Sequence, residues 1–402
     1  MATYSPRHFS HPEVLKTIHP KHLLALLEPH DEFFAKRGVS LPLDAGESPG
    51  DGIDYKALVH VFMTPDDDTP VPLNDALYLI NEMTSTEGMD ALLDAVRERG
   101  LRLDGDADRT PADVAVQVWL KDPDLMQRKH AELNLLVRPR SYTTYRSMLQ
   151  PPPPYRPPGD AAIHALESEL GRAFDQMGRS SSCRVLLFPQ AEDLWILVGH
   201  GDPYRREGTL AAGGRSTQVF YRPERFDVLI YGVRSGELRI NARSAKELEL
   251  YRVQVGHHLF GEAEFFKRAD VYTLQPIRDD GERCLACTDV PGLEWIKLVG
   301  LRFLWPGEPS ITVDWRSDHL FFAVKQRERE FPSRLPLLSA TFQIKFTDGG
   351  RPRSLTVRPP RNTSYMRDED SVCVEEWLRL RGFVVRKEQI QDATAGAVLA
   401  HA

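Results

Sequence analysis

The chain has 402 residues, more than one hydrophobic core normally supports, so we expect two or three domains. Hydrophobic residues make up 41% of the sequence and charged residues 27%, a balance that is typical of globular proteins and excludes extensive disorder. No apolar run approaches the roughly 18–20 residues that cross a membrane, so the sequence predicts no membrane span and no membrane partner.

The formal net charge of −7 is unevenly distributed along the chain. Residues 1–150 contain 24 acidic and 16 basic residues, a net charge of −8, whereas the remainder contains 34 acidic and 35 basic residues. This distribution disfavours non-specific binding of nucleic acid to the front half and leaves it open to the rear half. Four irregularly spaced cysteines indicate no disulfide framework, and the first residues contain no apolar signal segment. We therefore expect a protein of the reducing cytoplasm.

Residues 1–149 are predicted to form a helical domain made of short helices. Met89, Leu92 and Val96 share one face of a helix that Gly100 can end. Thr110 followed by Pro111 is typical of the start of the next helix, because threonine caps exposed N–H groups and proline suits the first turn.

Residues 150–160 are predicted to be a linker. Six prolines in eight residues cannot form a helix or a central strand, and they favour an extended polyproline II conformation. We interpret the segment as a spacer between the helical domain and the rest of the chain. A ligand for an aromatic-lined groove is the alternative interpretation.

Residues 161–270 are predicted to form an α+β domain. Leu166, Leu170 and Phe174 recur at helical spacing, and Ser244 with Glu247 forms a capping box that opens a second helix. Apolar runs between these helices predict strands, and Gly232–Leu238 reads as a hairpin turn. The predicted strands are CRVLLFP (183–189), DLWILVG (193–199), TQVFY (217–221), FDVLIYG (226–232) and ELRINA (237–242).

Residues 271–402 are predicted to be a strand-rich region that ends in a C-terminal helix. The helix carries Val374, Trp377 and Leu378, and Gly382 can end it. The expected strands are VYTLQPI (271–277), WIKLVGLRFLW (295–305), SITVDW (310–315), LFFAVK (320–325), LLSATFQIKF (337–346), SLTVRPP (354–360) and FVVRK (383–387). The predicted fold class is therefore α+β, with a helical N-terminal domain followed by a strand-rich α+β body.

Asp227 on one predicted strand, with Glu237 and Arg239 on the next, forms a candidate catalytic pattern. Carboxylates on adjacent strands can hold Mg²⁺, and a neighbouring lysine can position the attacking water. This arrangement resembles the core of restriction-endonuclease-type nucleases, and the resemblance implies a Mg²⁺-dependent nuclease as an alternative function. Arg239 stands where that family usually has lysine, and a guanidinium does not deprotonate.

Two further segments have a composition that can serve binding. Gly199–Ser216 lacks a phosphate-loop pattern, so we predict a long hairpin loop that remains a candidate contact surface. Cys284 and Cys287 form a CxxC pair without the second pair of ligands that a structural zinc site needs, and we place them on opposite sides of a strand. The sequence therefore predicts no metal and no cofactor.

The segment before the C-terminal helix is the candidate binding site. Residues 351–387 contain nine basic and five acidic residues, a net charge of +4. The candidate binding residues are Arg358, Arg361, Tyr365 and Arg367. Acidic residues on the helix itself disfavour its insertion into DNA. We expect the helix to complete the fold and the arginines to meet acidic protein surface or phosphates.

The expected function is a non-catalytic binding or scaffold subunit of a larger cytoplasmic protein assembly. No recognised catalytic motif is present, and tryptophan and arginine, which anchor interfaces, are frequent in the rear half. The expected partner is another protein, with nucleic acid possible through the rear half. The alternatives are the nuclease and a nucleic-acid-binding accessory protein.

Overall fold

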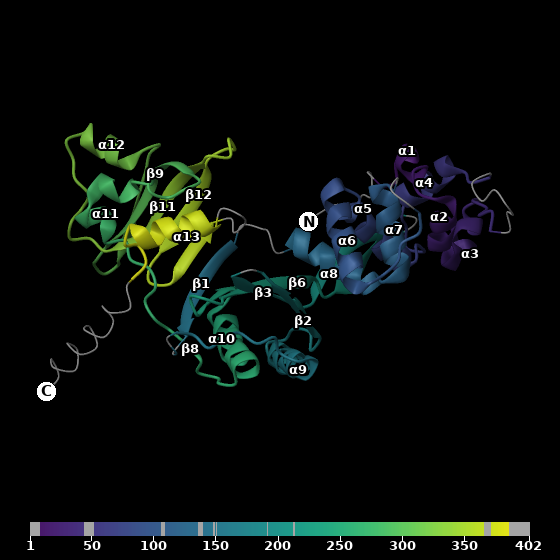
Figure 1. Ribbon diagram of the computed structural model, residues 1–402, viewed down its shortest axis with the longest axis horizontal. Helices are drawn as coiled ribbons and strands as arrows, with labels where there is room; N and C mark the ends of the chain where they lie inside the picture. The colour runs from purple at the N-terminus through teal and green to yellow at the C-terminus, as the bar shows by residue number, and fades with distance from the viewer. Residues whose placement is uncertain are drawn as a thin grey trace. The chain divides into compact units, whose positions relative to one another are not determined.

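The computed structural model describes residues 9–43, 52–105, 109–135, 140–147, 149, 151–190, 192–211, 214–365 and 371–385. The chain divides into two compact units, residues 1–136 and residues 137–402 (Figure 1). The first unit contains 24 acidic and 13 basic residues, a net charge of −11, and the second contains 34 and 38, a net charge of +4. The charge asymmetry of the sequence therefore follows the division between the units.

The described part of the first unit is helical. Its helices share one apolar core, to which every α-helix contributes at least one buried side chain. The elements are α1 (Pro12–Leu15), α2 (Pro20–Leu27), the 3₁₀ turn η1 (Glu28–His30), α3 (Asp31–Lys36), α4 (Tyr55–Met63), α5 (Val71–Met83), α6 (Thr86–Arg99), α7 (Pro111–Lys121) and α8 (Pro123–Leu135).

The capping signals of α6 and α7 act as the sequence predicts. Gly100 adopts a left-handed conformation with φ of 68° and ends α6, a conformation that costs glycine little. Thr110 accepts a hydrogen bond from the Asp113 N–H at 3.2 Å, and Pro111 is the first residue of α7.

Eleven strands of the second unit form one antiparallel sheet. The order is β10-β9-β11-β12-β13-β1-β7-β6-β3-β2, and β8 also pairs with β1. The strands are β1 (Arg140–Ser147), β2 (Cys183–Pro189), β3 (Asp193–Gly201), β6 (Glu224–Gly232), β7 (Glu237–Asn241), β8 (Phe266–Lys267), β9 (Leu293–Trp305), β10 (Ile311–Arg316), β11 (Leu337–Phe346), β12 (Arg353–Arg358) and β13 (Asn362–Tyr365).

Two apolar cores lie along this sheet. The helices α9 (Asp160–Gln176) and α10 (Ala245–Phe260) pack on β3, β6 and β7 and form one core (Figure 1). The helix α13 (Ser371–Leu380) packs on the other half, where the fully buried Trp377 contacts Phe342 of β11. The C-terminal helix therefore completes the fold.

The architecture confirms the α+β class, with helices in the N-terminal unit and a large antiparallel sheet in the C-terminal unit. Three predicted strands differ from the structure. Residues 383–385 of the expected strand 383–387 form only a single bridge at Val384, and residues 386–387 lie outside the described residues. Residues 320–325 form the helix α12 (Leu320–Lys325), because His319 caps the Phe322 N–H. Residues 271–277 form a single bridge at Tyr272 and then the short helix α11 (Pro276–Asp279). Among the described residues, no helix is long and apolar enough to cross a membrane.

The strand β1 lies where the sequence predicts the end of the helical domain. It pairs with β13 on one side and β7 on the other, so it joins the two halves of the sheet. The proline-rich segment follows β1 and precedes α9 within the same unit. Tyr155 contacts the buried Tyr231, their ring centroids 6.4 Å apart. The division between the compact units therefore falls at residues 136–137, before β1, and Tyr155 of the proline-rich segment packs against the core of the second unit.

Candidate functional site: an exposed ribbon on a charged root

A two-stranded antiparallel ribbon leaves the large sheet between β3 and β6. Its strands, β4 (Arg205–Ala211) and β5 (Arg215–Tyr221), pair with each other and with no other described strand. Leu210 and Phe220 of the ribbon are 75% and 63% exposed, and Tyr204 just before it is 65% exposed. Large apolar residues in such positions indicate a contact surface, since folding alone leaves them in water.

The ribbon continues the hairpin that β3 and β6 begin. Those two strands pair along their full length, and the Asp202 N–H donates to the Pro223 carbonyl at 2.8 Å just beyond them. An isolated two-stranded ribbon is only marginally stable in water, because it buries little apolar surface. The paired ends of β3 and β6 hold the two ribbon strands together and thereby lower the entropy that their pairing costs.

Buried charged side chains lie at the base of the ribbon. We call His200, Asp202, Arg225, Asp227 and Glu247 the root. Asp227 accepts hydrogen bonds from Arg225 Nη2 at 2.7 Å and from the Tyr251 hydroxyl at 2.8 Å, and His200 Nε2 lies 3.2 Å from its carboxylate. These contacts tie β3 and β6 to α10.

Glu247 connects the root to the start of α10. Its carboxylate accepts the Ser244 N–H at 2.6 Å, and the Ser244 hydroxyl accepts the Glu247 N–H, so the predicted capping box is confirmed. The other carboxylate oxygen faces Arg179 at 2.5 Å and Arg225 at 3.6 Å. One fully buried carboxylate therefore caps a helix and neutralises guanidinium groups.

Asp202 is the last member of the root before the ribbon. Its carboxylate lies 3.1 Å from Arg243, 3.8 Å from Arg225 and 3.8 Å from Arg205, the first residue of β4. Arg222, which follows β5, donates to the Gly178 carbonyl at 3.1 Å. Both ribbon strands are thus fixed at their inner ends by charged contacts.

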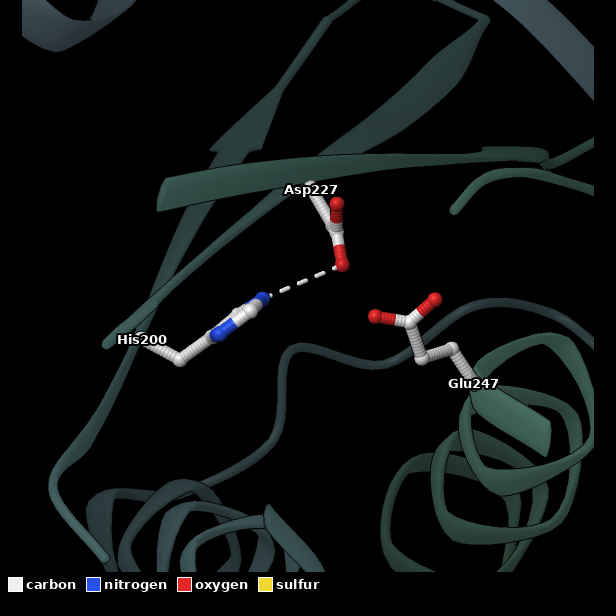
Figure 2. A group of neighbouring side chains, drawn as sticks. All are labelled: His200, Asp227 and Glu247. Carbon is white, nitrogen blue, oxygen red and sulfur yellow. Dashed lines mark hydrogen bonds and ion pairs between the residues drawn. The ribbon is translucent and has the colours of Figure 1, made fainter. Parts of the chain in front are cut away.

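Three residues of the root have the chemistry of metal ligands. His200, Asp227 and Glu247 point toward one another from β3, β6 and α10, and their ligand atoms lie within 4.8 Å (Figure 2). The positive charges of the neighbouring arginines disfavour a bound metal ion. The three buried carboxylates of Asp202, Asp227 and Glu247 are matched by the guanidiniums of Arg179, Arg225 and Arg243. A divalent cation would leave two uncompensated positive charges in a buried place. We therefore assign the root a structural role.

Burial and pairing shift the pKa of Asp227 in opposite directions. Burial favours the neutral acid, but His200, Arg225 and Tyr251 outweigh it and hold the pKa of Asp227 below its ordinary value. Burial, together with the neighbouring Asp227 charge, raises the pKa of Tyr251, so the phenol stays protonated and donates its hydrogen bond.

The three residues of the alternative nuclease site do not come together. Glu237 lies opposite Gly232, five residues from Asp227 along β6, which is about 17 Å at the usual rise of a strand. Because five is an odd number, the two carboxylates point to opposite faces of the sheet. Arg239, on the face of Glu237, binds Glu375 of α13 at 2.8 Å. This register assembles no shared Mg²⁺ site from these residues.

The candidate binding residues near the C-terminus do not form one surface either. Arg358 is exposed at the end of β12, whereas Arg361 is half-buried with its guanidinium 5.4 Å from the Tyr145 ring centre. Tyr365 is buried and donates its hydroxyl to Glu375 at 3.0 Å. Arg367 lies outside the described residues. The described members of this set therefore offer one exposed arginine and no common patch.

The CxxC pair differs from its predicted setting. Cys284 lies in the 3₁₀ turn η2 (Gly281–Leu285) and Cys287 just after it, and both are buried in the core beneath α13. Burial raises the pKa of the Cys284 thiol to about 12, so it is not a reactive thiolate near neutral pH.

Sequence reasoning retained the ribbon segment as a candidate contact surface but missed the root as a network. It singled out Asp227 for catalysis and Glu247 only as a cap. The missed signal is a pair of alternations. His200 lies near the end of β3 with Asp202 just beyond it, and Arg225 and Asp227 lie at the start of β6. Polar residues at alternate positions of two adjacent apolar strands point to one face. No protein-family model and no curated protein sequence matches this chain.

Proposed function

We propose that this chain is a non-catalytic binding protein that holds a macromolecular partner with its ribbon. One observation carries the proposal: the ribbon exposes Leu210 and Phe220 while its base is fixed by a buried ionic network. A rigidly based element loses little entropy when a partner binds, which favours affinity. Aromatic side chains beside arginines, such as Phe220 opposite Arg206, are the residue types that dominate binding energy in interfaces.

We propose a non-catalytic role because the candidate catalytic side chains are buried, paired or separated. Asp227 and its neighbours are buried and paired with arginines, and Glu237 lies on the other face of the sheet. A subunit of a larger assembly remains the setting that we propose for such a binding element.

The test is a chain with a shortened ribbon. Glu207 and Val219 lie opposite each other, so replacing residues 208–218 by Asn-Gly gives a two-residue hairpin turn. We expect circular dichroism and the melting temperature to stay close to wild type. Affinity purification from the native host should recover a stoichiometric partner with the full chain and lose it with the shortened one.

The matched control removes exposed apolar surface elsewhere in the same unit. Trp305 and Ile311 are paired on β9 and β10 and are 57% and 58% exposed. The double variant Trp305→Ser, Ile311→Ser should keep the partner. A protein or nucleic-acid partner that stays bound to the shortened chain would show the proposal to be wrong, as would a full chain that binds neither protein nor nucleic acid.

A further inference from the structure

We propose that the partner of the ribbon is double-stranded DNA, contacted in the major groove by the face that carries Arg206, Gln218 and Phe220. This inference rests on the proposed function, since it names the partner of the same element. The strand register places these three side chains on one face, because Arg206 lies opposite Phe220 and Gly208 lies opposite Gln218. Leu210, two residues further along β4, shares that face.

The charge of the ribbon suits a phosphate backbone. Residues 204–222 contain four arginines and one acidic residue, a net charge of +3 in a chain whose overall charge is −7. The single acid, Glu207, accepts the Tyr221 hydroxyl at 2.9 Å and lies on the opposite face from Arg206. The face that we assign to DNA therefore carries no carboxylate. Arginine also matches phosphate geometry better than lysine, because its donors are fixed in a fork.

The shape of the ribbon suits the major groove of B-form DNA. Two strands lie about 4.8 Å apart, and a two-stranded ribbon fits a groove about 12 Å wide. Arg206 and Gln218, linked by a hydrogen bond of 2.7 Å, are side chains that read guanine and adenine edges. The narrow major groove of double-stranded RNA does not admit such an element.

The apolar residues of this face are dispersed and do not form a protein-type core. Leu210 lies opposite Ser216, Phe220 lies opposite Arg206, and Gly208 with Gln218 separates them. A protein interface instead gathers its apolar residues into a desolvated centre with a polar rim. Separate apolar side chains beside Arg206 and Gln218 fit contacts with thymine methyl groups and bases along a groove. These observations favour DNA over an acidic protein surface.

The experiment measures binding of the full-length chain to a fluorescent duplex of about 20 base pairs between about 50 and 200 mM NaCl. Arg205 and Arg222 are held at the ribbon base by Asp202 and the Gly178 carbonyl. Arg206 on the DNA face and Arg215 beside the turn, on the other face, remain for phosphates and give a slope of log affinity against log salt of up to about −1.8. The variant Arg206→Ala, Arg215→Ala should make that slope shallower by about 1.8 and weaken binding about 60-fold at 0.1 M salt. The Arg215 side chain is exposed and makes no hydrogen bond or ion pair within the described residues, and its backbone pairing with Ala211 is kept in the variant, so the substitution should not affect folding.

The control variant Arg234→Ala, Arg283→Ala changes the net charge by the same amount. Both side chains are at least 80% exposed, and both lie outside the ribbon. We expect it to bind DNA within about twofold of wild type, by the additivity of distant surface sites. Equal weakening of both double variants would overturn the ribbon as the DNA site.

Three outcomes would overturn this inference, and the second of them leaves the proposed function standing. If the full chain binds no duplex at 50 mM salt and concentrations of about 10⁻⁴ M, double-stranded DNA is overturned as the partner. Loss of a purified protein partner on shortening the ribbon, without DNA binding, would overturn only the inference. Binding to duplex RNA with equal affinity would overturn the major-groove geometry, because that groove is closed to the ribbon in RNA.

Discussion

Asp227 shows at the scale of one residue how the root is stabilised. Its carboxylate neutralises Arg225 and accepts the Tyr251 hydroxyl, and all three groups lie within the fold. Asp227→Ala leaves the buried Tyr251 phenol without its acceptor and removes the carboxylate that lies nearest to the largely buried Arg225 guanidinium. We expect a loss of about 3–5 kcal/mol in the free energy of unfolding, measured by urea denaturation. Asp314→Ala removes a similarly close partner of Arg302, but on the surface, and should cost about 1 kcal/mol or less.

The pH dependence of the same variant provides a second readout. The pKa of Asp227 in the folded chain lies below its ordinary value of 3.8, so the unfolded chain takes up the proton at higher pH. The stability that its charge contributes is complete above about pH 4 and is lost as pH falls through the folded pKa. The difference between wild type and Asp227→Ala should therefore begin to narrow as pH falls below about 4 and should continue to narrow as pH falls through the folded pKa of Asp227. A constant difference would mean that the charge of Asp227 contributes nothing.

At the scale of elements, sequence patterns predicted helices well where caps and apolar spacing agree. The helices α6, α7 and α10 have an N-cap side chain that accepts a backbone N–H, and each was predicted. The ribbon was predicted as a loop up to Ser216, because glycine, threonine and alanine give little strand signal without an apolar face. His319 at the start of α12 is a weaker cap signal than serine or threonine, which explains the wrong strand there.

The ribbon should also differ from its parent strands in dynamics. None of its described residues belongs to an apolar core, whereas β3 and β6 contribute buried residues such as Ile196 and Leu229 to one. Amide protons of residues 205–221 should exchange with deuterium at least about 100-fold faster than those of β3 and β6, measured by mass spectrometry. Adding the partner should slow exchange in the ribbon alone. Equal protection in the free protein would contradict an unpacked ribbon.

At the scale of the whole chain, the domain boundary is the feature that sequence predicted least well. Composition places the break at the prolines, because six prolines in eight residues are usually a spacer. The structure uses that segment as a connection from β1 to α9, packed against Tyr231. Residues 140–147 offer Ser, Thr, Tyr and Arg without an apolar run, so their place in the centre of a sheet depends on partners far away in sequence.

Two fragments distinguish the two boundaries. Residues 137–402 retain β1, which pairs with β13 through residues such as Tyr142 and with β7 through Tyr145, both buried. We expect this fragment to be monodisperse and to unfold cooperatively in urea. Residues 150–402 lack β1, so β7 and β13 would expose unpaired edges at the centre of the sheet. That fragment should aggregate or unfold without a sharp transition, measured by size-exclusion chromatography and circular dichroism. Equally cooperative unfolding of both fragments would show that β1 does not join the halves of the sheet, and it would restore the proline segment as the boundary.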